Sequence, residues 1–412
     1  MMNAHIITIG DEILVGQTVD TNSTFIAQEL NKIGVSVDEI QSIKDNEKHI
    51  VKSLEHGLKN SNLVIITGGL GPTNDDITKK VLVDYFKDEL VLYPEILNRI
   101  KDFFVRFNKP FLDVNTYQAL LPQNADILIN DLGTASGMWF KQDHKNIISL
   151  PGVPYEMKGL MVKVIDKLKS DYDLGDLYHK TILLQGIGEA YLADELKVWE
   201  KEIKSKGISV SYLPSVGQLK VRLTGQTNQS KYINSKLLEI EQNYPKQVFG
   251  YNNDRLEVVL GNILKNHNLT VGTVESCTGG GLANRFVSVP GSSAYFKGGI
   301  VSYANEIKMN LIGVDEKSIQ EFGVVSQSVV EQMAIGGIKK LNVDYCISTS
   351  GIAGPDGGSD EKPVGTVWIG IASHHKVWSH KFQFGHTRQN NIESTIIYGL
   401  NYLRRVLLKL ED

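Results

Sequence analysis

The stretch TGGLGPTNDD, Thr67–Asp76, follows the apolar run Leu63–Ile66 and leads into a helical pattern that continues to Phe86. A strand that ends in glycines and opens a helix brings several backbone N–H groups to one point, where an anionic oxygen can bind. The adjacent carboxylates Asp75 and Asp76 would repel a bare phosphate, and a hard divalent cation is the usual bridge between such acids and phosphate. The stretch therefore predicts a βα unit for a phosphate-bearing substrate and a divalent metal. The alternative is an ordinary βα turn with an acidic helix start.

Strand-like and helix-like segments alternate on both sides of this stretch. Short apolar runs predict strands, and apolar residues at spacings of three and four predict amphipathic helices. We expect strands at 4–10, 35–40, 63–66, 127–129 and 147–150, and helices at 25–33, 46–58, 75–86 and 94–107. This alternation favours an α/β domain over residues 1–170, with a mostly parallel sheet covered by helices on both faces.

The pattern changes after about residue 170. Strand-like runs at 180–185, 208–213 and 218–224, with helical runs at 191–204 and 230–244, indicate a small α+β module with an antiparallel sheet over residues 171–252. A second α/β domain is expected over residues 253–412. Its helices are predicted at 255–267, 277–286, 326–340 and 391–410, its strands at 270–274 and 345–349, an extended run at 294–303 and a hairpin at 364–384.

The composition narrows the class of protein. With 412 residues, the chain is long enough for two or three domains with cores of their own. Its net charge of −4 and the lack of a basic tract argue against nucleic acid as a partner, and no apolar run is long enough to span a membrane. The chain start does not resemble a signal peptide. Cys277 and Cys346 form no disulfide or zinc motif, which fits a reducing compartment, so we expect a cytoplasmic protein.

Three other loops of the first domain also follow predicted strands or carry glycines and polar groups. They are Gly10–Glu12, 130–137 (NDLGTASG) and 150–157 (LPGVPYEM). Because loops at the carboxyl ends of parallel strands share one edge of a sheet, we expect them to converge with 67–76. Each acid alone is more often a helix cap or a solvated group, but together four of them would hold one cation: Asp11, Asp75, Asp76 and Glu156.

A second glycine-rich loop, 350–358 (SGIAGPDGG), lies almost three hundred residues downstream and predicts a separate second site. The third domain has neither a GxSxG motif nor a Cys-His pair at a recognisable spacing, so hydrolysis there needs another nucleophile and base. Ser293 with a neutral Lys308 is a workable dyad if burial lowers the lysine pKa, and Tyr303 would relay a proton or hold the lysine. The alternative, which spacing alone favours, is that Ser292 and Ser293 are turn residues and Lys308 is a solvated helix lysine.

The motifs resemble those of the CinA family along nearly the whole chain. The resemblance is carried by GDEILVGQTVDTNS, TGGLGPTNDDIT, NxxGTAxG and LPGVPYEM in the first domain, and by TVESCTGG, PGSSAYFKGGIVSYANEIK and KPVGTVW in the third. It implies an α/β protein with a molybdopterin-binding-like N-terminal domain, a KH-like middle module and a C-terminal amidase domain. One departure is Ser136, where the family usually has proline.

The resemblance also implies two activities and a homodimer. The C-terminal domain of the family hydrolyses the carboxamide of nicotinamide mononucleotide, giving nicotinate mononucleotide and ammonia without a cofactor. N-terminal domains of this type are reported to cleave ADP-ribose to AMP and ribose 5-phosphate, using K⁺ and a divalent ion such as Mg²⁺, Mn²⁺ or Co²⁺. Two alternatives remain: an amidase whose N-terminal domain binds a nucleotide or molybdopterin without cleaving it, and a competence-linked scaffold without turnover.

Site residues follow from the matching positions. The family's serine, tyrosine and lysine fall on Ser293, Tyr303 and Lys308, and Asp76 matches the metal-serving aspartate of the related fold. Substrate contacts are predicted for Thr67, Gly68, Gly69, Gly71, Thr73, Asn130 and Gly133 in the first domain, and for Ser276, Gly279, Gly280, Gly351, Gly354 and Arg388 in the third. No lysine or arginine follows Arg388 until Arg404, so a phosphate contact there would depend on Arg388. Cys277 is expected to be a small buried residue, although a helix start favours a thiolate.

Overall fold

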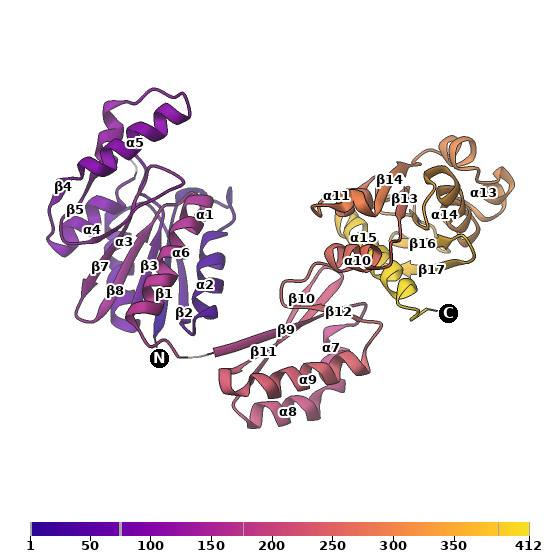
Figure 1. Ribbon diagram of the computed structural model, residues 1–412, viewed down its shortest axis with the longest axis horizontal. Coiled ribbons are helices and arrows are strands. Elements are labelled where there is room, and N and C mark those ends of the chain that lie inside the picture. The colour runs from indigo at the N-terminus through magenta and orange to yellow at the C-terminus, as the bar shows by residue number, and fades with distance from the viewer. Residues whose placement is uncertain (1, 74–75, 176, 386, 412) are drawn as a thin grey trace. The chain divides into compact units, whose positions relative to one another are not determined.

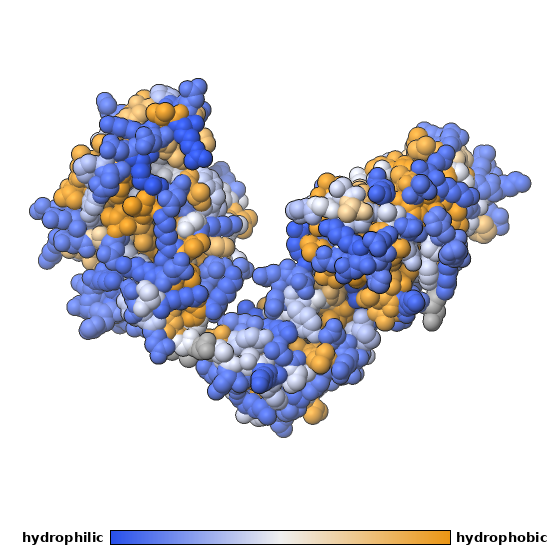
Figure 2. All heavy atoms as spheres, viewed as in Figure 1, coloured by the Kyte–Doolittle hydropathy of each residue, from blue (hydrophilic) through white to orange (hydrophobic). Residues whose placement is uncertain are grey.

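The computed structural model describes residues 2–73, 76–175, 177–385 and 387–411. The chain forms two compact units, Met1–Tyr178 and His179–Asp412 (Figure 1). The second unit contains two sheets, and the division of the chain into domains 1–170, 171–252 and 253–412 stays a prediction. Hydrophilic side chains cover much of the visible surface of each unit (Figure 2). Among the described helices, none has the length and apolar character needed to cross a bilayer.

The first unit is built on a six-stranded sheet of order β2-β1-β3-β8-β7-β6. The strands β2, β1, β3 and β8 are parallel, whereas β7 and β6 are antiparallel to their neighbours. The bounds are β1 (Asn3–Ile9), β2 (Ser36–Ile43), β3 (Leu63–Thr67), β6 (Asp126–Leu128), β7 (Gly137–Gln142) and β8 (Lys145–Leu150). The α/β fold is as predicted, but β7 was missed. It pairs with β8 through a tight turn in which Asp143 and His144 both have positive φ.

Helices cover both faces of this sheet. Alternate side chains of β1 and β3 point to opposite faces, so Ile6 and Ile65 lie in one core and Ile7 and Val64 in the other. The first core is closed by α2 (Asn22–Lys32) and α6 (Pro154–Asp171), and the second by α3 (Glu47–Asn60), α4 (Thr78–Phe86) and α5 (Pro94–Arg106). The unit also contains α1 (Asp11–Leu14), η1 (Asp113–Ala119) and the pair β4 (Leu90–Leu92) and β5 (Leu120–Pro122).

The second unit begins with a four-stranded sheet of order β10-β11-β9-β12. The pairs β10–β11 and β9–β12 are antiparallel, in agreement with the α+β prediction for this segment. The elements are β9 (Leu177–Gln185), α7 (Glu189–Glu195), α8 (Lys197–Ser205), β10 (Ser209–Ser215), β11 (Gln218–Gln226), η2 (Thr227–Gln229), α9 (Ser230–Asn243) and β12 (Val248–Tyr251). The strand β12 was not predicted.

The second sheet of this unit has the order β14-β13-β15-β16-β17, in which the first three strands are parallel and the last two antiparallel. Its strands are β13 (Val271–Glu275), β14 (Phe296–Val301), β15 (Tyr345–Gly351), β16 (Thr366–Ser373) and β17 (Val377–Gln383). One face packs on α14 (Gln327–Leu341) and the other on α10 (Leu256–Asn266), α11 (Gly281–Val287) and α15 (Arg388–Leu407). The remaining elements are η3 (Ser292–Ala294), α12 (Asn305–Ile307), η4 (Lys308–Ile312) and α13 (Glu316–Phe322).

Two predicted helices begin later than expected, and both differences affect a site. The helix α4 begins at Thr78, so Asp76 lies in the loop before it and not inside the helix. The helix α11 begins at Gly281 because Gly279 and Gly280 have φ of 58° and 96°. This left-handed conformation is easy for glycine but breaks a helix, so the segment after Glu275 forms a turn first.

Candidate functional site

A cleft of about 550 Å³ lies at the carboxyl ends of β1, β3 and β8. It is lined by Ile9–Glu12, Asp45, Gly68–Pro72, Asp76, Gln118, Thr134, Ala135, Pro151–Val153 and Glu156. The structure thus brings together the four loops that the sequence analysis expected to converge. It adds two acids that we did not predict, Glu12 and Asp45. Asp45 follows β2, so the rule on parallel strand ends would have found it. Asp75 lies outside the described residues.

Several glycines of these loops make room for the carboxylates. A Cβ on Gly71 would collide with the carboxylate of Asp76, and one on Gly133 would collide with that of Glu156. A Cβ on Gly69 would meet the hydroxyl of Thr78. These glycines let the acidic side chains pack directly against backbone, which keeps the acids close to the loop amides.

The amides of the glycine loop divide into two groups. The N–H of Gly68 donates to the carbonyl of Leu150 at 3.0 Å, so it cannot hold a phosphate oxygen. The N–H groups of Gly69, Leu70 and Gly71 donate to no group in the described part of the chain, and all three residues line the cleft. The predicted anion site therefore shortens to Gly69–Gly71.

Two predicted substrate contacts have structural partners instead. Thr67 is fully buried, donates its hydroxyl to the carbonyl of Pro151 at 2.9 Å and accepts from Asn22 Nδ2 at 3.1 Å. The amide of Asn22 also donates to the carbonyl of Gly152 at 2.8 Å. Thr67 and Asn22, which the sequence analysis missed, thus tie two cleft loops together. Thr73 donates both its N–H, at 3.0 Å, and its hydroxyl to Asp76 Oδ2.

Glu156, which lines the cleft, forms a buried pair with Asn130. Glu156 Oε2 accepts from Asn130 Nδ2 at 2.5 Å, and the same amide donates to the carbonyl of Ala135 at 3.0 Å. Burial raises the pKa of Glu156, against the opposing hydrogen bonds from Asn130 and Tyr155. A carboxyl group that is desolvated in this way would gain from a bound cation. Asn130 and Gly133 line an adjoining pocket of about 240 Å³.

The donors of the cleft fit the predicted divalent ion. Asp11, Asp76 and Glu156 all line it, and carboxylate oxygens are the ligands that Mg²⁺ and Mn²⁺ prefer. Asp11 is exposed in the first turn of α1, so it can turn toward an ion. Their role as metal ligands stays a prediction.

In the second unit, a set of polar residues lies at the carboxyl ends of the parallel strands β13, β14 and β15. Ser276 follows β13, Tyr303 follows β14 and Gly351 ends β15. The Ser276 N–H donates to the carbonyl of Thr349 at 3.0 Å, and the Ser302 N–H donates to that of Glu275 at 2.8 Å, which holds these strand ends side by side.

Lys308 points into this edge and is 1% exposed. Its Nζ donates to the carbonyls of Ser302 and Tyr303 at 2.7 and 2.8 Å, and it has no carboxylate partner among the described ion pairs. Burial lowers its pKa, and the nearby Cys277 opposes this shift. The alternative of a solvated helix lysine is therefore wrong, because Lys308 is a desolvated amine with two neutral acceptors.

Ser293 lies at the other end of the same sheet. It belongs to η3, just before β14, and the carbonyl of the nearby Tyr295 accepts from the N–H of Val271, the first residue of β13. Tyr303 lies two residues after the end of β14, so the whole six-residue strand separates it from Ser293. A strand of this length spans about 17 Å. Within one chain, the structure therefore brings Ser276, Tyr303 and Lys308 to one edge but leaves Ser293 at the opposite edge.

The state of Cys277 is clear from its surroundings. It is 8% exposed, and burial raises the pKa of its thiol to about 12. A thiol with this pKa stays protonated near neutral pH and is a poor nucleophile. Cys277 is therefore the small buried residue that we expected.

The start of α11 is already occupied by an anion. The buried carboxylate of Glu275 accepts from the N–H groups of Gly280, Leu282 and Ala283 at 2.8–3.0 Å. The N–H of Gly279 donates to the carbonyl of Ser276 at 3.2 Å. The amides of Gly279 and Gly280 are thus not available to substrate. Glu275 was missed, because the predicted strand ended at residue 274 and the sequence analysis gave the acid that follows it no role.

The second glycine loop is held by the start of α15. Arg388 donates from its guanidinium to the carbonyl of Gly354 at 2.7 Å, and Asn391 Nδ2 donates to that of Ala353 at 3.0 Å. Gly351 is packed closely against Val367, where a Cβ would meet the valine side chain. Arg388 is exposed, so it positions the loop and still faces solvent.

The folds and sites define a multidomain α/β protein with a polar site at a strand-end edge in each unit. Residues 5–170 match the family model described as "Probable molybdopterin binding domain", and residues 253–407 match "CinA C-terminal domain". A CinA-like protein of Flavobacterium psychrophilum is 44% identical over 99% of both chains, and one of Cytophaga hutchinsonii is 42% identical over all of both. The chain belongs to the CinA family. Among solved structures, a competence/damage inducible protein of Agrobacterium tumefaciens is 34% identical over 37% of this chain and 93% of its own, with a TM-score of 0.36.

Proposed function

We propose that this protein is a cytoplasmic hydrolase of pyridine nucleotides with two independent sites. The C-terminal site hydrolyses nicotinamide mononucleotide to nicotinate mononucleotide and ammonia. The N-terminal site cleaves ADP-ribose to AMP and ribose 5-phosphate in the presence of a divalent ion and K⁺. The observation that carries the first activity is the buried Lys308, whose lowered pKa suits a general base, at the strand-end edge where Ser276 and Tyr303 also lie.

The chemistry of the C-terminal site starts from a serine. Its Oγ attacks the carboxamide carbon while the neutral Nζ of Lys308 takes the hydroxyl proton. Lys308 then gives this proton to the leaving nitrogen of the tetrahedral intermediate, whose C–N bond breaks, so ammonia departs and an acyl-serine ester remains. Water, deprotonated by the same amine, cleaves the ester and restores the serine. The carbonyls of Ser302 and Tyr303 hold the amine in place through both steps.

Two serines are candidates for the nucleophile, and they differ in whether the active site needs one chain or two. Ser276 is half-buried at the same strand-end edge as Lys308, so it would act within one chain. Ser293 would have to come from a second copy in a homodimer, because the length of β14 separates it from its own Lys308. The family resemblance favours Ser293 in a homodimer, whereas the position in the single chain favours Ser276.

Mixing of subunits distinguishes these serines. If Ser293 acts across a dimer, Ser293→Ala and Lys308→Ala are each inactive, but their mixture regains about a quarter of the wild-type rate, since half of the dimers are mixed and each has one intact site. If Ser276 acts within the chain, Ser276→Ala is inactive, Ser293→Ala keeps its activity, and no mixture of Ser276→Ala with Lys308→Ala recovers. Full activity of both serine variants would refute the serine mechanism.

The N-terminal cleft supports the second activity by its charges. The amides of Gly69–Gly71 would bind phosphate oxygens, and the carboxylates of Asp11, Asp76 and Glu156 would hold a divalent ion that offsets the charge of the pyrophosphate. The adjoining pocket adds the cationic side chains of Arg99 and Arg106. AMP formation from ADP-ribose against metal concentration tests this site. If ADP-ribose binds without AMP formation at any metal concentration, the domain binds the nucleotide and does not cleave it.

A further inference from the structure

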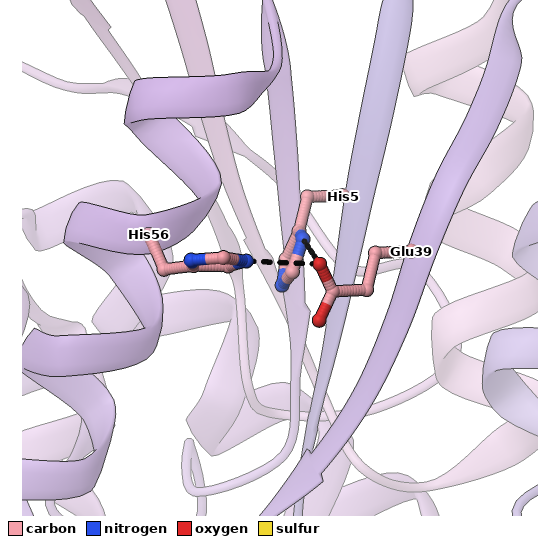
Figure 3. Close-up of side chains that lie close together, drawn as sticks. All are labelled: His5, Glu39 and His56. Atoms are coloured by element: carbon pink, nitrogen blue, oxygen red, sulfur yellow. Dashed lines mark hydrogen bonds and ion pairs between the residues drawn. The ribbon is translucent and has the colours of Figure 1, made fainter.

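Three side chains of metal-ligating type lie together on the first unit, apart from both sites described above. They are His5 of β1, Glu39 of β2 and His56 of α3 (Figure 3). Glu39 Oε2 lies 3.7 Å from His5 Nδ1 and 2.9 Å from His56 Nε2. All three ligand atoms are within 4.8 Å of one another.

The packing of three elements fixes this group. The parallel register of β1 and β2 places His5 directly beside Glu39. The helix α3 approaches closely because Gly57 has no side chain, and a Cβ there would lie 3.2 Å from the ring of His5. The two imidazole rings meet edge to face, with centroids 5.5 Å apart and an angle of 72°.

We propose that His5, Glu39 and His56 bind one divalent ion of the zinc type. Two imidazole nitrogens and one carboxylate oxygen are the ligand set that zinc and its neighbours in the first transition row accept, with a fourth position left for water. Tetrahedral zinc with ligands at about 2.0–2.1 Å keeps them about 3.4 Å apart. The observed separations of 2.9 and 3.7 Å lie on either side of this value, so small side-chain rotations would suffice.

An ordinary ion pair explains only part of the group. The exposed pair of Glu39 and His56 is a normal hydrogen-bonded contact. The ring of His5 is 1% exposed, yet its Nε2 makes no hydrogen bond to any described residue, and its Nδ1 is too far from Glu39 for a hydrogen bond. A buried imidazole nitrogen that makes no hydrogen bond is unfavourable. A metal on Nδ1 would give that nitrogen a partner.

A neighbouring side chain, Gln41, could accept a hydrogen bond from the second ring nitrogen of His5. Gln41 lies two residues after Glu39 on β2 and its side chain interacts with His5, while its buried Oε1 makes no hydrogen bond to any residue that the structure describes. An ion on Nδ1 would leave the ring proton on Nε2, and the Gln41 side chain would be the acceptor for it. Metal-bound histidines generally donate their other N–H to such a group, which fixes the ring.

This site differs in chemistry from the cleft. The cleft offers oxygen ligands, which select hard ions such as Mg²⁺, whereas imidazole ligands favour zinc over magnesium. Glu39 and His56 are about half exposed, so an ion can enter from solvent. A bound ion would link β1, β2 and α3, the elements from which the loops with Gly10 and Asp45 continue to the cleft.

The test is a calorimetric titration of the metal-free full chain with Zn²⁺, in excess Mg²⁺ to fill oxygen-only sites. The wild type should bind one Zn²⁺ per chain at this site. Loss of an outer partner of a metal site alone lowers affinity by about 10–100-fold, so His56→Ala and Glu39→Gln should each weaken binding by at least about tenfold. Both residues are exposed, so the variants should fold.

Matched controls come from the same helix. His49→Ala and Glu55→Gln remove an exposed histidine and an exposed acid of α3 that lie outside the group, and both should bind Zn²⁺ like the wild type. Co²⁺ should give the visible absorption of a four-coordinate site in the wild type and controls, but not in His56→Ala. Equal Zn²⁺ affinity of the wild type, His56→Ala and Glu39→Gln would overturn the proposal, as would an equal loss in the two control variants.

Discussion

Replacement of Lys308 probes the proposed amidase most sharply. Lys308→Met keeps the length and apolar stem of the side chain but removes the amine. A positioned general base contributes about 10²–10⁴-fold to a rate, so deamidation of nicotinamide mononucleotide should fall by that factor in kcat. Lys308→Arg should be equally inactive, because arginine keeps its proton under all assay conditions.

The amine of Lys308 should also determine how the rate of deamidation depends on pH. Burial lowers the pKa of Lys308 from its ordinary value of 10.5, and only the neutral amine can accept a proton. The wild-type kcat/KM should therefore rise with pH until it passes the lowered pKa and then level off. In Lys308→Met this rise should disappear, because its titrating group is gone.

Stability must be measured beside the rate. Lys308→Met leaves the carbonyls of Ser302 and Tyr303 without their donor, which costs about 1–3 kcal/mol each, while removal of a desolvated amine acts in the opposite direction. A urea titration monitored by circular dichroism shows whether the variant is folded under assay conditions. Near-wild-type deamidation by folded Lys308→Arg would refute the assignment of Lys308 as a base.

Three further predictions concern other residues. Asp76→Asn should lose metal-dependent AMP formation from ADP-ribose and keep deamidation, and an unchanged metal titration would show that Asp76 only holds its loop with Thr73. Glu275→Gln should lower the free energy of unfolding by about 1.5–3 kcal/mol in urea, since three amides lose a charged acceptor, and a difference below about 0.5 kcal/mol would contradict this. Burial lowers the pKa of Lys79 from 10.5 to about 8, so the unfolded chain binds more protons between these values and stability should rise with pH across this window, by up to about 3 kcal/mol. Lys79→Met should remove that rise, and urea midpoints at several pH values for both proteins would show a parallel pH dependence if this is wrong.

The sequence was sufficient for most elements and for the position of the first site. Buried strands followed by glycine loops are strong signals, and the rule that parallel strand ends share an edge brought Asp11, Asp76 and Glu156 to one cleft. The antiparallel strand β7 was missed because its turn at Asp143 and His144 contains none of the glycines that usually mark a hairpin.

The interior hydrogen bonds were harder to predict. Thr67 and Gly280 have the residue types of a substrate loop, but tertiary partners occupy their polar groups. Those partners lie far along the chain or on another element, so local patterns do not reveal them. The separation of Ser293 from Tyr303 could have been predicted from the sequence. The extended run between these two residues already requires a distance of many ångströms within one chain.

The central claim is that two independent hydrolytic sites act on pyridine nucleotides, and one paired assay tests it most directly. Ammonia from nicotinamide mononucleotide and AMP from ADP-ribose are measured on the same preparations of wild type, Lys308→Met and Asp76→Asn. The wild type should release both products, Lys308→Met only AMP, and Asp76→Asn only ammonia. Absence of both products from folded wild-type protein supplied with divalent metal and K⁺, or loss of both activities in either variant, would contradict the account.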